Sequence, residues 1–400
     1  MKIIFITYDL PYPLSSGGKI RAFQMLKALS ARYEITLYSY VRTDPDPGHL
    51  TELRKYCREI RLYQRQKVWS LGHFLRAGFS ALPGTIAHYV CPKLKQDLLT
   101  ELTTGGYLAV HFESYYSSLY LPEVKALGIN TILGTENIEY DLYRKFVLSL
   151  PFIALPLKAF LYFDLGKMRR FEENSWRLAD SVLAVSEEEA AVISKAAGRE
   201  VQVVANGVDI RQFAAVARKA SGPPTVIFVG NLKYLQNDRG IKKFLSVTLP
   251  IIRKECPDLV VKIVSSHRPA WINDYLSGIE LIIDSQTPFS EFAPRADVLI
   301  NPVEVKGGTR IKLLEGLAAG LPVVTYSSSL SGFDRLVPGR DLLVAETPES
   351  FAASVVRLLG DAALRDKIGA GGREVAVGNY SWDKSMARLL NIYQKLIIDE

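Results

Sequence analysis

The segment Asn301–Val324, NPVEVKGGTRIKLLEGLAAGLPVV, carries the strongest local signal for the fold of this chain. The apolar run Asp297–Asn301 that leads into it has the composition of a short buried strand. Thr309 can cap a helix through its hydroxyl group, and apolar residues recur at helical spacing after it. Gly320 fits the left-handed residue that ends a helix, and Pro322 prevents its continuation. The segment therefore predicts a strand–loop–helix–strand unit, which crosses over right-handedly in a parallel sheet.

The loop of this unit gathers glycines and charged side chains at a helix end. Gly307 and Gly308 lie just before the predicted helix, where free N–H groups and a partial positive charge favour phosphate. Arg310, Lys312 and Glu315 follow at the start of the helix, and the last two are three positions apart, on one side of it. Cations suit phosphate and a carboxylate suits a sugar hydroxyl, so together they indicate a bound nucleotide. The alternative is a tight turn followed by a solvated Lys–Glu pair.

Strand-like and helix-like segments alternate along the chain, and the alternation starts again after Asn206. The stretch Ala205–Thr225, rich in Gly, Pro and polar residues, separates the two series as a linker would. Two βα series predict an α/β protein with two doubly wound, Rossmann-like domains facing across a cleft, where a ligand would lie at the carboxyl ends of the strands. The predicted strands are Ile3–Tyr8, Ile35–Val41, Tyr107–Phe112, Thr131–Glu136, Ser181–Ser186, Thr225–Gly230, Leu259–Ser265, Leu281–Asp284, Asp297–Asn301 and Pro322–Tyr326.

Composition is that of a globular protein, and the sequence argues against a membrane-spanning, metal-binding or disulfide-linked protein. With 400 residues the chain is too long for one ordinary core, and 48% hydrophobic with 23% charged residues is typical of folded domains. The start, MKIIFITYDL, reads directly into a strand without the layout of a signal peptide, and no uncharged apolar run is long enough to span a membrane. The three cysteines and five histidines are scattered, so we expect no metal site, no disulfide framework and a cytoplasmic location.

A second glycine pair occupies a similar place in the first domain. Gly17 and Gly18 follow the predicted strand Ile3–Tyr8 and open a helix with an apolar face. The G-x-G-x-x-G spacing of dinucleotide-binding loops is absent, and so is the G-x-x-x-x-G-K-[ST] phosphate loop. The pair is therefore either part of the ligand site, opposite the Gly307 loop, or an ordinary strand-to-helix turn.

Taken in order, these segments resemble the family 4 glycosyltransferases of the GT-B fold, and the resemblance covers nearly the whole chain. It implies transfer of a sugar from a nucleotide-sugar donor to an acceptor, with retention of anomeric configuration and without metal or another cofactor. It also implies an acceptor-side domain of residues 1–205 joined by a C-terminal helix at 381–400, and a nucleotide-sugar domain of residues 206–380. The motifs that carry it are PYPLSSGGKIR, SVLAVSEEE, VVANGVD, FVGNLKYLQND, GGTRIKLLEGLAAGLPVV and YSWDKSMARLLNIYQKL.

In the second domain the resemblance assigns the donor site residue by residue. Glu315 matches the second glutamate of the family's paired-glutamate motif, which binds the ribose hydroxyls of the donor. Gly307 replaces the first glutamate, so we expect backbone N–H groups, Arg310 and Lys312 to hold the sugar and phosphates instead. The family's phosphate-binding arginine is replaced by Asn231, and Arg239 stands near the place of a second cation. The donor-binding candidates of this domain are Asn231, Arg239, Gly307, Gly308, Thr309 and Glu315.

In the first domain the resemblance is looser. Glu136 occupies a position where the family often shows histidine, whereas His111 lies one strand earlier. Gly17 and Gly18 are carried over as donor-binding residues.

Prearranged cations and dipoles stabilise the negative charge on a departing diphosphate. The catalytic candidates are Lys312, Arg310, Glu136 and His111.

Basic residues concentrate between Arg54 and Arg76, where seven cations accompany one carboxylate, so the window carries 7 − 1 = +6 of a chain total of +7. Interleaved aromatic residues make this window suited to anionic lipid headgroups. The apolar stretch Phe146–Phe163 is either a second membrane contact or a helix packed on the first domain. We expect a saccharide, polysaccharide-precursor or lipid-linked acceptor and an anionic membrane surface on the cytoplasmic side. No nucleic acid is expected, because no recognition module accompanies the charge.

Two other functions stay open at the level of sequence. A sugar-nucleotide epimerase of the same fold would need no acceptor surface. A non-catalytic sugar-nucleotide-binding protein would explain why Gly307 replaces the first motif glutamate. Binding without turnover would separate the latter from an enzyme.

Overall fold

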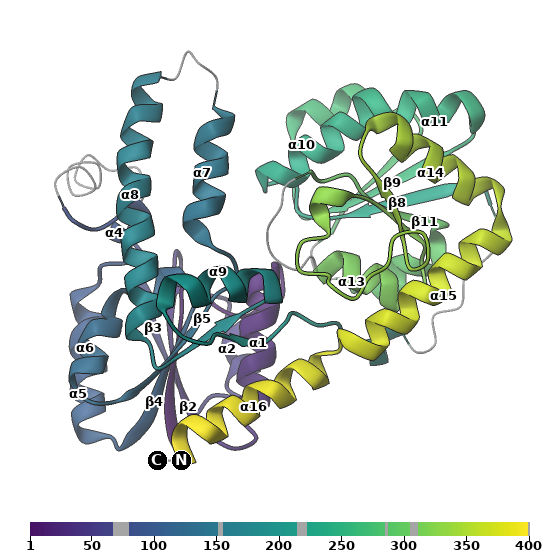
Figure 1. Cartoon of the computed structure of the whole chain (residues 1–400). Coiled ribbons are helices and arrows are strands. Elements are labelled where there is room, and N and C mark those ends of the chain that lie inside the picture. The colour runs from purple at the N-terminus through teal and green to yellow at the C-terminus, as the bar shows by residue number, and fades with distance from the viewer. Residues whose placement is uncertain (67–79, 151–154, 214–221, 285–286, 305–310, 399–400) are drawn as a thin grey trace. The chain divides into compact units, whose positions relative to one another are not determined.

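The structure, a computed structural model, forms two compact units (Figure 1). Unit 1 comprises Met1–Val204 and Met386–Glu400, and unit 2 comprises Ala205–Ser385. Each unit contains one parallel sheet with helices packed on it, which confirms the predicted α/β class with two Rossmann-like domains. The residues that the structure describes are 1–66, 80–150, 155–213, 222–284, 287–304 and 311–398.

The sheet of unit 1 is parallel throughout, with strand order β3-β2-β1-β4-β5-β6-β7. The order runs outwards in one direction from β1 to β3 and in the other from β4 to β7, so the topological switch point lies between β1 and β4. Ligands of doubly wound sheets bind outside the carboxyl ends of the strands at such a point. The strands are β1 Lys2–Thr7, β2 Glu34–Val41, β3 Glu59–Gln64, β4 Tyr107–Glu113, β5 Asn130–Gly134, β6 Ser181–Ala184 and β7 Gln202–Val203.

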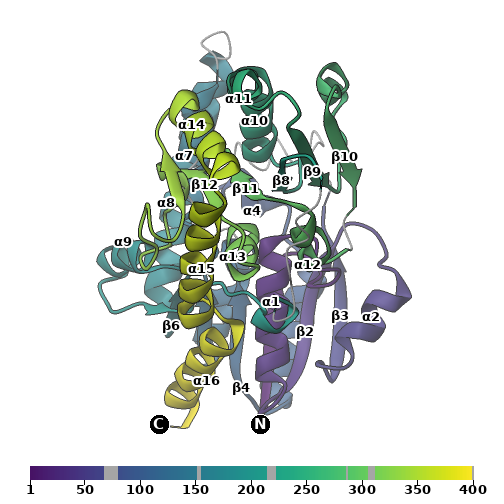
Figure 2. The same ribbon diagram turned by 90° about the vertical axis from the view of Figure 1, so that its right-hand side faces the viewer.

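Unit 2 repeats this design with strand order β10-β9-β8-β11-β12-β13, so its switch point lies between β8 and β11. In Figure 2 the strands β8, β9 and β10 follow one another out to the edge of the sheet. The strands are β8 Thr225–Val229, β9 Val260–Ser265, β10 Ile279–Ile283, β11 Val298–Asn301, β12 Val323–Tyr326 and β13 Leu343–Ala345. The edge strands β3, β7 and β13 were not among the predicted strands.

The core of unit 2 shows why its strands are apolar on both sides. Val226 and Phe228 of β8 belong to one buried cluster, whereas Ile227 between them belongs to another. Successive side chains of a strand point to opposite faces, so each face needs its own helical cover. Helices α10 (Leu235–Lys243), α11 (Leu249–Glu255) and α14 (Pro348–Gly360) supply residues to the first cluster. Helices α12 (Phe289–Phe292) and α13 (Ile311–Ala318) supply residues to the second, and α15 (Ala362–Asn379) supplies residues to both.

Helices follow most of the strands in both units. In unit 1 they are α1 Gly17–Leu29, α2 Pro47–Leu53, α4 Gly84–Ala87, α5 Pro92–Thr104, α6 Leu121–Ala126, α7 Glu139–Ser149, α8 Leu155–Leu178 and α9 Glu187–Ala197, with a 3-10 helix at Tyr115–Tyr120. In unit 2 they are α10 Leu235–Lys243, α11 Leu249–Glu255, α12 Phe289–Phe292, α13 Ile311–Ala318, α14 Pro348–Gly360 and α15 Ala362–Asn379, with a π-helical turn at Phe244–Thr248. The last helix, α16 Trp382–Ile398, belongs to unit 1 from Met386 onwards.

Candidate functional site

At the switch point of unit 1, a glycine lets two polar side chains approach the start of α1. Ser16 caps this helix by accepting a hydrogen bond from the backbone N–H of Lys19 at 3.4 Å, and the helix begins at Gly17. A Cβ atom at Gly18 would collide with both carboxyl oxygens of Glu136 and would lie 2.6 Å from the hydroxyl oxygen of Tyr8. Gly18 therefore serves the close packing of these groups.

The carboxyl group of Glu136, which follows β5, lies in this packed region. Its Oε2 atom accepts a hydrogen bond from the Tyr8 hydroxyl at 3.4 Å, whereas Oε1 is buried without a hydrogen-bond partner in the described part of the chain. Burial, together with the neighbouring Glu113 and Glu139 carboxylates, raises the pKa of Glu136 from 4.5 to about 8. The group is therefore protonated near neutral pH, and a neutral carboxylic acid can donate a hydrogen bond.

His111 lies inside unit 1, with no exposed surface. Its Nδ1 atom is 2.7 Å from the hydroxyl oxygen of Tyr393, and its Nε2 atom is 2.7 Å from Oε2 of Glu113. Glu113 also accepts a hydrogen bond from Nε of Arg21 at 2.9 Å, and Arg21 donates from Nη1 to the carbonyl of Val204 at 2.6 Å. Burial acts to raise the pKa of Glu113, but Arg21 and His111 outweigh it and hold the pKa below 4.5. The geometry favours a structural role for His111, and its catalytic role stays a prediction.

Three further residues at the switch point were missed by the sequence reasoning: Tyr8, Tyr116 and Glu139. The Tyr116 hydroxyl donates to Oε2 of Glu139 at 2.8 Å, and the ring centroids of Tyr8 and Tyr116 are 5.4 Å apart. Glu172 holds the start of α7 by accepting hydrogen bonds from the backbone N–H groups of Glu139 and Tyr140, both at 2.9 Å. Burial raises the pKa of Glu139. A usable signal existed, because each missed residue lies at, or a few positions after, the carboxyl end of a predicted strand.

In unit 2, the predicted donor residues follow the two strands that flank the switch point. Asn231 comes just after β8, and its carbonyl oxygen accepts a hydrogen bond from Nδ2 of Asn237 at 3.0 Å. Arg239 is exposed on α10. A Cβ atom at the next residue, Gly240, would lie 2.6 Å from the carbonyl oxygen of Pro302. The backbone beside Arg239 therefore packs against the segment that follows β11.

Lys312 and Glu315 form an ion pair on the first turns of α13, with Nζ 2.7 Å from Oε2. The Lys312 side chain is 44% exposed and the Glu315 side chain is 16% exposed, so both can meet a ligand. This geometry fits a donor site, but it equally fits the alternative of a solvated pair. The other predicted residues of this loop, Gly307, Gly308, Thr309 and Arg310, lie outside the described residues.

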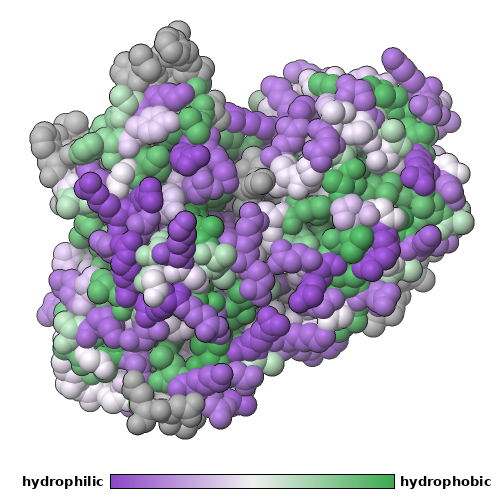
Figure 3. Space-filling view, in the orientation of Figure 1, coloured by the Kyte–Doolittle hydropathy of each residue, from purple (hydrophilic) through white to green (hydrophobic). Residues whose placement is uncertain are grey.

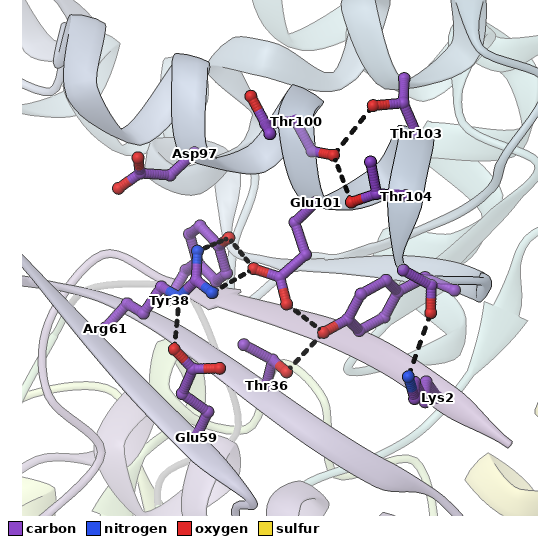
Figure 4. A network of polar contacts seen from close by, with 12 residues as sticks. Lys2, Thr36, Tyr38, Glu59, Arg61, Asp97, Thr100, Glu101, Thr103 and Thr104 are labelled. Carbon is purple, nitrogen blue, oxygen red and sulfur yellow. Dashed lines mark hydrogen bonds and ion pairs between the residues drawn. The ribbon is translucent and has the colours of Figure 1, made fainter.

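Most described cations of the predicted basic window, Arg54–Arg76, already have partners within the protein. Figure 4 shows Arg61 between two carboxylates, with Nε 2.7 Å from Glu59 and Nη2 2.5 Å from Glu101. The same arginine donates to the Tyr38 hydroxyl at 3.1 Å. Lys55 pairs with Glu52, Arg58 pairs with Glu34, and Arg65 donates to the hydroxyl of Tyr89 at 2.8 Å. Three of the five described cations, Lys55, Arg58 and Arg61, are thus paired with carboxylates. Two of these carboxylates lie on other elements, Glu34 on β2 and Glu101 on α5. Residues 67–79 of the region lie outside the described part.

Two further expectations concern metal and membrane. Within the residues that the structure describes, no group of His, Cys, Asp and Glu side chains is placed to hold a metal ion. In the same residues, no helix is both long enough and apolar enough to cross a membrane. The apolar stretch Phe146–Phe163 forms the end of α7 and the start of α8, apart from residues 151–154, which lie outside the description.

Comparison with protein families and curated sequences agrees with this geometry. Residues 223–361 match the model of the family Glycosyl transferases group 1. A phosphatidyl-myo-inositol mannosyltransferase of Propionibacterium freudenreichii is 28% identical over 223 residues, which cover 54% of this chain and 56% of the relative. The chain thus spans little more than half the length of that curated relative.

Solved structures match over the full length of the chain. A sucrose-phosphate synthase from Thermosynechococcus elongatus superposes with a TM-score of 0.74 at 16% identity and covers 100% of both chains. HepE from Anabaena, solved in complex with UDP-glucose, gives a TM-score of 0.70 at 13% identity and covers 99% of this chain and 100% of HepE. At such low identity these likenesses establish the fold, which is GT-B.

Proposed function

We propose that this chain, a GT-B protein with a Glycosyl transferases group 1 domain at residues 223–361, is a glycosyltransferase acting on a nucleotide sugar. Unit 2 would bind the donor and unit 1 the acceptor. The observation that carries the proposal is the family match, because it spans Asn231, Arg239, Lys312 and Glu315. The UDP-glucose complex of HepE, a protein of the same fold, supports a nucleotide sugar as donor.

The chemistry of unit 2 suits a donor that leaves as a nucleoside diphosphate. Breaking the bond between sugar and phosphate puts negative charge on the leaving group, and a nearby cation stabilises that charge. Lys312 is the described cation at the start of α13, and its Nζ atom is already oriented by Glu315 at 2.7 Å. Glu315 would accept hydrogen bonds from ribose hydroxyls, as the sequence resemblance implies. The mechanism would be retaining and independent of metal.

The chemistry of unit 1 suits a hydroxyl acceptor. Tyr8, Tyr116, Glu136 and Glu139 bring aromatic rings and carboxyl groups together at the carboxyl ends of β1, β4 and β5. Such a mixture of apolar rings and a few polar groups is what a saccharide-binding surface requires. With a pKa of about 8, Glu136 would donate a hydrogen bond at neutral pH and accept a proton at higher pH. We infer a lipid-linked or polysaccharide-precursor saccharide as the acceptor.

The decisive experiment has two steps. First, the purified protein is screened by thermal shift against nucleoside diphosphates and their sugars, since a ligand of the folded state raises the apparent stability. Second, the sugar that binds is incubated with candidate acceptors in excess chelator, and the anomeric configuration of the product is read by NMR. If no nucleotide sugar stabilises the protein, the proposal is wrong. Binding without any turnover would favour the non-catalytic binding protein, and isomerisation of the free donor would favour the epimerase.

A further inference from the structure

The helical hairpin formed by α7 and α8 carries apolar side chains that the proposed reaction does not use. In Figure 1 these two helices extend beyond the sheet of unit 1. Soluble proteins rarely leave several large apolar side chains exposed on one projecting element unless something covers them. Between Phe146 and Phe163, the large apolar side chains that are described and exposed are Phe146 at 41% and Leu148 at 50% on α7, and Phe160 at 38%, Tyr162 at 44% and Phe163 at 62% on α8.

The exposed side of α8 changes from aromatic to basic along the helix. Phe160 and Phe163 are three positions apart in its first half, and the exposed Arg170 follows Phe163 by seven positions, on the same side. At 1.5 Å per residue, Phe163 and Arg170 are separated by about 10 Å along the axis. Lys167 lies between them, with Nζ 4.8 Å from the centroid of the Phe163 ring. Figure 3 shows hydrophobic and hydrophilic residues side by side on this part of unit 1.

The charge around these aromatic residues is positive and partly unneutralised. Arg144, Lys158 and Arg170 form no ion pair with any described residue, in contrast to Lys55, Arg58 and Arg61 of the basic window. The acid closest in sequence, Asp164, is buried and accepts a hydrogen bond from the backbone N–H of Gly84 at 2.9 Å. The exposed surface therefore presents cations next to aromatic rings.

We propose that the α7–α8 hairpin, from Arg144 on α7 to Arg170 on α8, docks on an anionic lipid bilayer through its described residues. Phenylalanine and tyrosine side chains would enter the interface, where amphipathic and aromatic groups are stable, and Arg144, Lys158 and Arg170 would contact lipid phosphates. The unpaired cations beside the rings favour an anionic surface over an apolar groove of a protein partner. The inference rests on the proposed function in that docking would bring a lipid-linked acceptor to unit 1. It places the membrane contact on the hairpin rather than on the window Arg54–Arg76.

Flotation with vesicles of mixed phosphatidylglycerol and phosphatidylcholine, against phosphatidylcholine alone, tests the aromatic part of this surface. The double variant Phe160→Ser/Phe163→Ser should lower the partition coefficient by about tenfold or more. The matched control is Leu127→Ser/Val192→Ser, which changes side chains of unit 1 that are 41% and 44% exposed but lie outside the hairpin. The control should bind like the wild type. Equal losses in both variants would overturn the proposal, as would a wild-type protein that ignores anionic vesicles at low salt.

A second pair of variants separates the two basic surfaces. Arg144→Gln/Lys158→Gln/Arg170→Gln should release the protein from anionic vesicles, and Arg54→Gln/Lys55→Gln/Arg58→Gln should leave it bound. If the hairpin variant stays bound and the window variant is released, the membrane contact lies on the window Arg54–Arg76, and the proposal for the hairpin is wrong. Thermal shift with the donor is measured on every variant. An intact donor shift with lost vesicle binding supports the docking surface, whereas a donor shift absent even from the wild type would count against the proposed function alone.

Discussion

The hydroxyl oxygen of Tyr393, on α16, lies 2.7 Å from Nδ1 of His111 on β4, and both side chains are fully buried. The contact joins the last helix of the chain to a central strand of unit 1. It continues through Glu113 and Arg21 to the carbonyl of Val204, the residue at which the chain leaves this unit. One buried network of hydrogen bonds thus contacts Val204, where the polypeptide leaves unit 1, and Tyr393, on the helix with which it returns to this unit.

Replacing Tyr393 by Phe tests this connection. The variant leaves the buried Nδ1 of His111 without its partner, so we expect a loss of about 1–3 kcal/mol in the free energy of unfolding. The control is Tyr33→Phe, since the Tyr33 ring packs on Tyr393 with centroids 5.5 Å apart and is 4% exposed. No hydrogen bond of the Tyr33 hydroxyl is found within the described residues, so its removal should cost less. Urea denaturation monitors both, and equal losses would contradict the importance of the Tyr393–His111 bond.

A second prediction concerns the space occupied by Glu136. Gly18→Ala places a methyl group against the Glu136 carboxyl oxygens and the Tyr8 hydroxyl, and such overpacking costs about 1–3 kcal/mol. Gly166→Ala is the control, because a Cβ atom there meets nothing within 4 Å and alanine favours a helix over glycine. Thermal unfolding should therefore show opposite signs for the two variants. A Gly18→Ala protein as stable as the wild type would mean that Glu136 moves freely.

The overall fold was predictable because its signals are local and repeat. Apolar runs such as Thr225–Gly230 and Pro322–Tyr326 were predicted as strands close to their observed bounds, and the resemblance to GT-B glycosyltransferases is confirmed. The edge strand β7, Gln202–Val203, was missed because two residues give no periodicity. The edge strand β3 was missed because its residues, apart from Tyr63, are at least partly exposed and its composition includes charged side chains.

The candidate site was predictable only in part, because its geometry depends on contacts between distant residues. The position of Glu136 in the sequence says nothing of Gly18, which lies against it, or of the pKa shift that follows from burial. Likewise, the charge of Arg61 was interpreted as available for lipid, but besides Glu59 this arginine pairs with Glu101 on α5, forty residues later. Sequence spacing identifies residues on one element, whereas burial and pairing across elements need the fold.

The raised pKa of Glu136 predicts a pH-dependent contribution to stability. A carboxyl group whose pKa rises on folding favours the protonated state, so its contribution is fully present below pH 4.5 and is lost as the pH rises to about 8. Glu136→Gln keeps a neutral side chain at every pH. The stability of the wild type relative to this variant should therefore fall between pH 5 and pH 8, as melting temperatures at matched ionic strength will show. A difference that does not change with pH would mean an ordinary pKa for Glu136.

In unit 2, Glu315→Ala should weaken binding of the nucleotide sugar. A ribose hydroxyl that loses its acceptor costs about 1–3 kcal/mol, which corresponds to roughly tenfold or more in the dissociation constant. Glu280→Ala is the control, since Glu280 is another carboxylate of unit 2 in an ion pair, 3.1 Å from Lys262. Calorimetry compares the two variants. Unchanged affinity in a folded Glu315→Ala protein would leave Glu315 as a surface residue of α13.

Lys312 tests the chemical step itself. Negative charge on the leaving diphosphate grows towards the transition state, so a cation that stabilises it should affect turnover more than donor affinity. We expect Lys312→Ala to lower kcat by about a hundredfold while the dissociation constant of the donor changes less. Lys262→Ala, which removes the cation of the Glu280 pair, should leave both constants near those of the wild type. Activity of the wild type should also persist in excess chelator. If chelator abolishes turnover and magnesium or manganese restores it, a bound metal ion takes the part assigned to Lys312, and the metal-independent mechanism is wrong.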